Sequence, residues 1–274
     1  MQSADGNMTS SAMTSIETRR GRISIDEAGG GEGLPIIFLH GVGSDKRVWA
    51  PQLAHFGRQR RVLAFDYPGY GESEFVERAS RDDYADTMVA AMDALSIERA
   101  HVCGLSLGGV IAIAMHAAAP ARCASLIIAD SFALHPDGHG IHDRSVAASR
   151  TMDMRALAEA RSGFLLGSTA SEALRAEVID TMAGIDPFAY RLGVEAVWLA
   201  DQRERASAID VPTLILVGDE DIITPPPLSD ELGALIRGSR VEIINAAGHL
   251  SNAEQPEIFN ETVDRFLSGI EQQN

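Results

Sequence analysis

Short apolar runs alternate along the chain with segments in which apolar residues recur at helical spacing. The runs at residues 36–40 and 213–218 are almost continuously apolar, which is typical of strands covered on both faces in a parallel sheet. This alternation predicts a doubly wound α/β fold with a mostly parallel sheet. The predicted strands are residues 22–26, 36–40, 61–65, 100–105, 125–130, 213–218 and 240–244, and helices are predicted at residues 82–95, at residues 107–119 and after Pro256.

The alternation stops between residues 132 and 208, where three segments have helical spacing (154–161, 171–183 and 188–201) and no run is typical of a strand. This stretch begins with the sequence HPDGHGIH, which we interpret as a loop. We predict that residues 132–208 form a helical cap over the carboxyl ends of the strands, where open α/β sheets bind ligands. Residues 21–131 and 209–274 then form the core. Residues 1–20, many of them small and polar, are predicted to be a flexible N-terminal tail.

Composition narrows the class of protein. The chain has 274 residues, of which 45% are hydrophobic and 23% charged, as in an ordinary globular domain with an insertion. Its net charge of −16 disfavours binding to nucleic acid or to an anionic membrane surface, although a few local arginines can still attract an anionic substrate. No apolar run reaches membrane-spanning length, and the N-terminal sequence has no signal-peptide pattern, so we expect a cytoplasmic protein. Its two cysteines, Cys103 and Cys123, are too few for a disulfide framework.

The sequence GLSLGG at residues 104–109 follows a predicted strand and opens a predicted helix. This is the context of a nucleophile elbow, a turn so tight that it needs the small residues Gly104 and Gly108 on either side of Ser106. The turn should strain the backbone of Ser106 and push its hydroxyl out of the sheet, beside a helix N-terminus that favours negative charge. We predict that Ser106 is a catalytic nucleophile rather than part of a chance Gly-x-Ser-x-Gly.

A serine hydroxyl needs a base within hydrogen-bond reach, and the base needs a carboxylate that fixes its tautomer. His249, in the loop after the last predicted strand, should return to the same edge of the sheet as Ser106. Asp221, just beyond the strand TLILVG, is the first choice for the carboxylate, because Ser106, Asp221 and His249 then follow the chain order of this type of fold. Three rivals stay open: Asp219, Glu220 and Asp130.

An oxyanion that forms during acyl transfer needs preorganised N–H donors. We assign these to the backbone N–H groups of Leu107, directly after the nucleophile, and Val42, in the glycine-rich loop HGVG. No residue spacing predicts a cofactor or a metal site. Three histidines near the start of the cap fit no familiar ligand pattern and are interpreted as loop residues: His135, His139 and His142.

Together these pieces resemble the α/β-hydrolase fold superfamily. The segments of this chain that carry the resemblance are, in order, HGVG, DYPGYGES, GLSLGG, GDEDIITP and AGH. Three stretches are similar to 3-oxoadipate enol-lactonase-like serine hydrolases: HGVGSDKRVWAPQLAHF, HVCGLSLGGVIAIAMHAAAPARCASLIIADS and DVPTLILVGDEDIITPP. The resemblance implies cofactor-independent hydrolysis of a small ester, lactone or enol-lactone. Serine at the nucleophile position argues against haloalkane dehalogenases and epoxide hydrolases. The DYPGYGES turn is interpreted as architecture.

We therefore expect a serine hydrolase that forms an acyl-enzyme on Ser106 and acts on a small-molecule ester or lactone. One alternative is a C–C bond hydrolase of ring-cleavage products, which would need a cationic clamp for a carboxylate. Another is a non-catalytic ligand receptor on the same fold.

Trp49 is expected near the pocket entrance, as a substrate wall or a helix anchor. The oligomeric state is open, and a homo-oligomer is compatible with the sequence. Four cap residues could form the clamp: Arg144, Arg150, Arg155 and Arg191.

Overall fold

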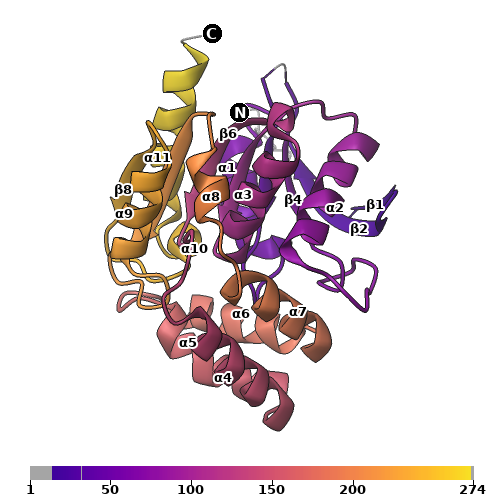
Figure 1. Ribbon diagram of the computed structural model, residues 1–274, viewed down its shortest axis with the longest axis vertical. Coiled ribbons are helices and arrows are strands. Elements are labelled where there is room, and N and C mark those ends of the chain that lie inside the picture. Colours follow the sequence, from indigo (N-terminus) through magenta and orange to yellow (C-terminus); the bar gives the residue numbers. More distant parts are fainter. Residues whose placement is uncertain (1–13, 32, 273–274) are drawn as a thin grey trace, which may run out of the picture.

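The computed structural model describes residues 14–31 and 33–272 and places eight strands in one sheet (Figure 1). The strand order is β1-β2-β4-β3-β5-β6-β7-β8, with antiparallel pairing only at β1–β2 and β2–β4. The predicted doubly wound, mostly parallel sheet is confirmed. The strands are β1 (Thr14–Thr18), β2 (Gly21–Ala28), β3 (Ile36–Leu39), β4 (Val62–Phe65), β5 (Ala100–Leu105), β6 (Cys123–Ala129), β7 (Thr213–Gly218) and β8 (Arg240–Ile244).

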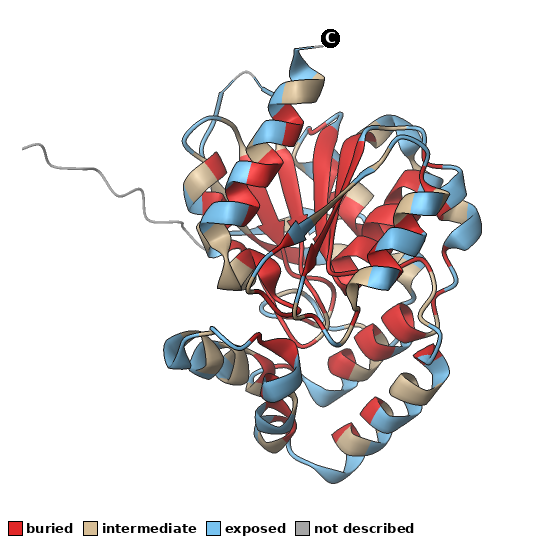
Figure 2. Cartoon of the chain, turned by 90° about the vertical axis from the view of Figure 1, so that its left-hand side faces the viewer, coloured by how far each residue is buried: buried red, intermediate tan, exposed pale blue. Residues whose placement is uncertain are grey.

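The central strands read as continuous apolar runs because both faces of the sheet are covered (Figure 2). Along β3, Ile36 and Phe38 belong to the core cluster on one face, whereas Ile37 and Leu39 belong to the cluster on the other, as the two-residue period of a strand requires. Helices α1 (Ala50–Phe56), α10 (Ser251–Glu254) and α11 (Pro256–Glu271) pack on the first face, and α2 (Arg81–Ala94), α3 (Leu107–Ala118), α8 (Arg203–Ser207) and α9 (Pro226–Leu235) on the second.

The expected flexible tail, residues 1–20, is wrong for the part that the structure describes. Residues Thr14–Thr18 form β1, which pairs antiparallel with β2 through a turn in which Gly21 has φ +102°. This strand is hard to recognise from the sequence because Ile16 is its one apolar residue, and an edge strand needs no buried face. Residues 1–13 lie outside the described residues.

Four helices between β6 and β7 lie over the carboxyl ends of the parallel strands (Figure 1): α4 (Gly138–Thr151), α5 (Met154–Leu165), α6 (Glu172–Ala183) and α7 (Pro187–Trp198). They pack in two pairs, α4 with α7 and α5 with α6. Where the chain enters and leaves this cap, Leu134 bridges to Asp201, and the N–H of Gln202 donates to the carbonyl of Ala133 (2.8 Å).

The loop interpretation of HPDGHGIH is wrong from Gly138 onward, where α4 begins. A Cβ atom on Gly138 would lie 2.2 Å from the carbonyl oxygen of Trp198, so this glycine lets α4 approach the end of α7 closely. His139 and His142 therefore lie on a helix, and His135 precedes it. Of the two glycines that suggested a loop, Gly138 thus serves helix packing.

None of the described helices has the length and apolar character needed to cross a bilayer. The expected cytoplasmic location stays a prediction.

Candidate active site

The turn around Ser106 has the strained geometry expected of a nucleophile elbow. Ser106 lies between β5 and α3 with φ +55° and ψ −114°, a conformation that a non-glycine residue rarely adopts. A Cβ on Gly104 would lie 2.1 Å from the carbonyl oxygen of Gly108, and a Cβ on Gly108 would lie 2.1 Å from that of Leu39. The Ser106 N–H donates to the carbonyl of Ala129 (2.9 Å), which ties the turn to β6.

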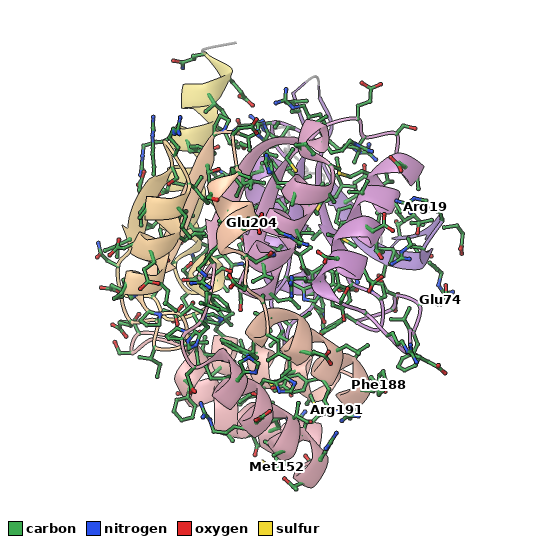
Figure 3. The ribbon with its side chains drawn as sticks, in the orientation of Figure 1. Arg19, Glu74, Met152, Phe188, Arg191 and Glu204 are labelled. Carbon is green, nitrogen blue, oxygen red and sulfur yellow. The ribbon has the colours of Figure 1, made fainter. Side chains whose placement is uncertain are left out.

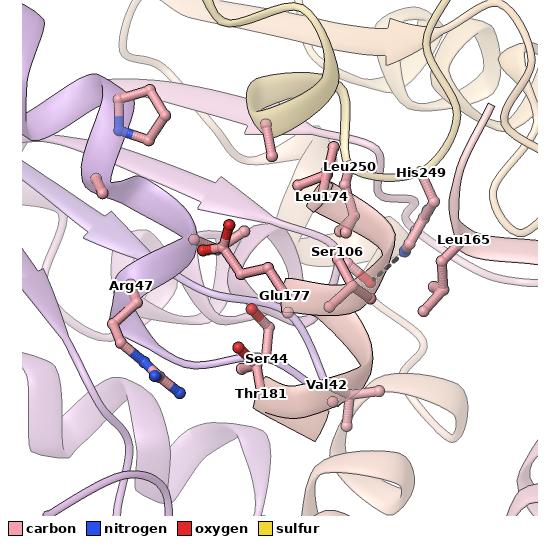
Figure 4. A pocket seen from close by; sticks show the side chains of 17 residues that line it. Val42, Ser44, Arg47, Ser106, Leu165, Leu174, Glu177, Thr181, His249 and Leu250 are labelled. Carbon is pink, nitrogen blue, oxygen red and sulfur yellow. Dashed lines mark hydrogen bonds between the residues drawn. The ribbon is translucent and has the colours of Figure 1, made fainter. Parts of the chain in front are cut away.

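Three predicted residues from distant parts of the chain meet at this edge of the sheet. The Nε2 atom of His249 lies 3.0 Å from the Oγ atom of Ser106, and its Nδ1 atom lies 2.8 Å from the Oδ2 atom of Asp221. Figure 4 shows the Ser106–His249 contact on one side of a pocket. All three side chains are buried, so water competes little with these hydrogen bonds.

The carboxylate of Asp221 is held in place by its own loop. It accepts hydrogen bonds from the backbone N–H groups of Ile223 (2.8 Å) and Thr224 (3.0 Å) and from the Thr224 hydroxyl (2.7 Å). Burial alone would raise the pKa of Asp221, but the neighbouring His249 and these hydrogen bonds lower it below its ordinary value. The sequence reasoning missed Thr224, although an aspartate in a loop typically bonds to the backbone just after it, as Asp221 does to Ile223.

The charge distribution also favours protonation of His249. Burial by itself would lower the pKa of this imidazole, but the Asp221 charge and hydrogen bond, with a smaller effect of Asp130, raise it above the ordinary value. An imidazole with a raised pKa is a stronger base, and its protonated form is stabilised by the carboxylate beside it.

Asp130, a rival for the carboxylate role, has different partners. It follows β6 with φ +47°, and it accepts hydrogen bonds from the N–H of Gly218 (2.9 Å) and the hydroxyl of Ser251. Complete burial and the nearby charge of Asp221 raise the pKa of Asp130 to about 8. The raised pKa favours the protonated form of Asp130, whose hydrogen bonds to Gly218 and Ser251 support the loops around the site.

The other two rivals also bind elsewhere. Asp219 accepts from the N–H of Ala247 (3.3 Å), and Glu220 accepts from the backbone and the hydroxyl of Ser168. Of the three consecutive acidic residues 219–221, Asp221 is the one whose side chain contacts His249. The chemistry of the three positions is similar, so the choice depends on where the loop points each side chain.

The loop that carries His249 is fastened to the cap. Glu254 accepts hydrogen bonds from the N–H groups of Gly248 (3.0 Å) and Leu250 (3.3 Å), on either side of His249, and from that of Gly167 in the cap (2.7 Å). The N–H of His249 itself donates to the carbonyl of Leu165 (2.9 Å). Backbone positions on both sides of the histidine are thus fixed by one carboxylate that sequence reasoning missed.

The glycine-rich loop after β3 passes close to the serine. A Cβ on Gly41 would lie 3.2 Å from the Cβ of Ser106, and Val42 follows it along the pocket wall. Leu107 is the first residue of α3, so its N–H belongs to the helix end where backbone donors lack an intrahelical partner. Both predicted oxyanion donors, Val42 and Leu107, are therefore on segments adjacent to Ser106.

A pocket of about 220 Å³ opens in front of Ser106 and His249 (Figure 4). Its apolar wall comes from the core and the cap and includes Leu165, Leu174, Val178 and Leu250. Its polar side includes Ser44, Arg47, Glu177 and Thr181. Sequence reasoning overlooked Arg47 and Glu177, because a charged residue in a helical segment cannot be told from an ordinary solvent-facing residue by its sequence alone.

The four cap arginines considered for a cationic clamp are not among the residues that line this pocket. Arg144 pairs with Asp137 and Arg155 with Asp180 at exposed positions, and Arg150 is exposed. Arg191 lies over the ring of Phe188 (5.7 Å) on the outer side of α7 (Figure 3). The clamp proposed from the sequence is therefore wrong for this pocket.

The position of Trp49 settles one further expectation. Trp49 is completely buried against Phe38 and Phe259 (ring centroids 4.9 and 6.1 Å apart), so it is a helix anchor and not a substrate wall. No cluster of histidine, cysteine or carboxylate ligands suited to a metal occurs within residues 14–31 and 33–272.

Comparison with known proteins gives consistent matches. A family model described as "Alpha/beta hydrolase family" matches residues 36–262. The chain is 31% identical to 3-oxoadipate enol-lactonase 1 of Acinetobacter baylyi, over 93% of this chain and 97% of that protein. It is 27% identical to carboxylesterase YbfK of Bacillus subtilis, over 93% of this chain and 87% of that protein.

Among solved structures, the enol-lactonase from Burkholderia xenovorans superposes with a TM-score of 0.88 at 28% identity, over 93% of this chain and all of that one. These matches confirm the resemblance to α/β hydrolases and to 3-oxoadipate enol-lactonases that the motifs indicated. They also support the predicted enzyme class, a hydrolase of carboxylic esters or lactones.

Proposed function

Because this chain belongs to the alpha/beta hydrolase family, we propose that it hydrolyses small carboxylic esters or lactones through a covalent acyl-enzyme on Ser106. The observation that carries the proposal is the continuous hydrogen-bonded series from Asp221 through His249 to Ser106 beside a pocket. The enol-lactonase and carboxylesterase relatives support an ester or lactone bond as the bond that is cleaved. The proposal requires no cofactor.

In the first half of the reaction, the Nε2 atom of His249 takes the proton from the Ser106 hydroxyl as its oxygen attacks the substrate carbonyl. The carbonyl π electrons move to oxygen, and the N–H groups of Leu107 and Val42 stabilise the oxyanion. Asp221 holds the imidazole in the required tautomer and stabilises its protonated form. The tetrahedral intermediate then collapses, the bond to the leaving oxygen breaks, and His249 gives its proton to that oxygen.

In the second half, a water molecule replaces the leaving group. His249 takes a proton from water as the water oxygen attacks the acyl carbonyl, and the same two N–H groups stabilise the second oxyanion. Collapse breaks the bond between the acyl carbon and the Ser106 oxygen, which recovers its proton from His249. The products are a carboxylic acid and an alcohol, or one hydroxy acid when the substrate is a lactone. An enol-lactone releases an enol, which becomes a ketone.

The direct test compares wild type with Ser106→Ala on p-nitrophenyl acetate, p-nitrophenyl butyrate and a panel of small lactones. We expect turnover by wild type and a loss of on the order of 10³-fold or more in the variant, because the nucleophile is removed. Ser268→Ala, at an exposed position on α11, is the matched control and should retain full activity. Activity that survives in Ser106→Ala would overturn the mechanism, and an inert wild type would overturn the proposed function.

A further inference from the structure

The pocket is lined by one positive and one negative side chain, and the positive one already has an ion-pair partner. Arg47 and Glu177 are its charged lining residues apart from His249. The guanidinium of Arg47 contacts the Asp45 carboxylate three times, from Nε to both oxygens (3.0 Å each) and from Nη2 to Oδ2 (2.6 Å). The positive charge on this wall is therefore matched by a negative charge in direct contact with it.

The Asp45 carboxylate depends on Arg47 as its cation, and this dependence keeps Arg47 from binding a ligand instead. Asp45 is 6% exposed, and its side chain also accepts from the backbone N–H of Arg47 (2.9 Å) at the start of the helical turn η1 (Lys46–Trp49). Burial would raise the pKa of this carboxyl, but the hydrogen bonds from Arg47 lower it, so Asp45 stays ionised. Losing Arg47 would leave a buried carboxylate without its cation.

Glu177 is placed on the pocket side of α6. Leu174, Glu177, Val178 and Thr181 all line the pocket, and their spacing of three, four and seven residues puts them on one face of the helix. Figure 4 shows the Glu177 side chain projecting from this face into the same space as Ser44 and Arg47. Glu177 is thus the one charged residue on a helix face that also presents two apolar side chains and a threonine to the pocket.

We propose that the pocket selects esters or lactones whose acyl group carries no negative charge, and that Glu177 excludes anions. The inference rests on the proposed function and names its substrate class. An acyl group bound at Ser106 would extend along Leu174 and Val178, and a carboxylate at its far end would meet Glu177 and an arginine already neutralised by Asp45. A chain with net charge −16 adds a repulsive background.

Two probes of matched length test the charge selection. p-Nitrophenyl butyrate has an uncharged acyl chain, whereas p-nitrophenyl hydrogen succinate has a carboxylate in place of the terminal methyl group. We expect wild type to have a kcat/KM for butyrate on the order of tenfold or more above that for succinate at low salt. High salt should narrow the difference, because ions screen charges near the surface.

Glu177→Gln keeps the shape of the side chain and removes its charge. It should raise the succinate-to-butyrate ratio of kcat/KM by about three- to tenfold, and Glu177→Lys should raise the ratio further. Glu172→Gln is the matched control, because Glu172 lies at an exposed position of the same helix outside the pocket lining, and it should leave the ratio unchanged.

A wild-type preference for succinate, or the same ratio in Glu177→Gln and wild type, would overturn the inference. In both cases hydrolysis of butyrate that depends on Ser106 would leave the proposed function standing. A wild type that is inert on both esters would overturn the proposed function and this inference with it.

Discussion

Helix α3 begins directly after Ser106 and helix α6 lines the pocket, and the two helices differ in how deeply the fold buries them. Every residue of α3 from Leu107 to His116 is buried between the sheet and the neighbouring helices. Along α6, Met182 alone is buried, and Glu177 is exposed. We infer that the proposed chemistry depends on the buried core, whereas the proposed selection of substrate depends on a mostly exposed cap helix.

The catalytic candidates of the core are also held by their own turns and loops. The core contributes Ser106 and Asp221, whose positions are fixed by backbone hydrogen bonds and by glycines with no room for a Cβ. Substitutions in the core should therefore change kcat or stability, whereas substitutions along the pocket face of α6 should change which substrates are accepted.

The largest effect is expected when the two aspartates beside His249, Asp221 and Asp130, are each replaced by asparagine. Asp221→Asn should lower kcat by roughly 10²- to 10⁴-fold, because an amide cannot stabilise the protonated imidazole or fix its tautomer. Asp130→Asn should lower kcat by less than about tenfold, because the amide oxygen can still accept from the Gly218 N–H and the amide NH2 can donate to the Ser251 hydroxyl, which then becomes the acceptor. Steady-state assays of the two variants on p-nitrophenyl butyrate give the comparison, and a larger loss in Asp130→Asn would reverse the assignment.

The pH profile of kcat/KM supplies an independent check on Asp221. His249 accepts a proton only when neutral, and its raised pKa places the acid limb of the wild-type profile above the ordinary histidine value of 6.5. Removing the Asp221 charge should move the acid limb of the residual activity to lower pH. A limb that stays in place would show that Asp221 does not set the pKa of His249.

The next prediction concerns the fastening of the histidine loop to the cap. Glu254→Ala leaves three backbone N–H groups without their acceptor, so kcat should fall about tenfold, and the free energy of unfolding should fall by about 2 kcal/mol. Glu261→Gln, at an exposed position on α11, is the control. Denaturant unfolding and steady-state kinetics separate the two effects, and an unchanged kcat would mean that the loop holds His249 without Glu254.

The last prediction concerns the pH dependence of stability. The pKa of Asp130 is about 8 in the folded protein and 3.8 ordinarily, so between these pH values the folded chain keeps a proton that the unfolded chain releases. Stability therefore falls as pH rises through this window. Asp130→Asn should remove the loss and become more stable than wild type at the upper end, by the order of 1 to 3 kcal/mol. Unfolding measured from pH 5 to about 9 tests this, and parallel curves for both proteins would contradict it.

How far the sequence predicts the site depends on how local each constraint is. The elbow around Ser106 is set by clashes within a few residues, so Gly104 and Gly108 are visible in the sequence. The choice of Asp221 over Asp219 depends on the path of one loop in three dimensions, and the residues alone left it open. Glu177 gave no signal, because a charge on an exposed helix normally faces solvent.

The fold shows the same limit. Central strands such as β3 are recognisable because burial on both faces demands apolar residues, whereas the edge strand β1 makes no such demand. Helix α4 was hidden by glycines, of which Gly138 fits against the carbonyl of Trp198. The sequence shows that a residue is a glycine, and the tertiary structure shows whether that glycine serves a turn or a close contact between helices.

Covalent labelling of the nucleophile tests the central claim most directly. Phenylmethanesulfonyl fluoride should attach one sulfonyl group per chain, peptide mapping by mass spectrometry should place it on Ser106, and esterase activity should fall in proportion to labelling. Ser106→Ala should take up no label. Full activity in a completely labelled protein, or a label on another residue that accounts for the loss of activity, would contradict acyl transfer through Ser106.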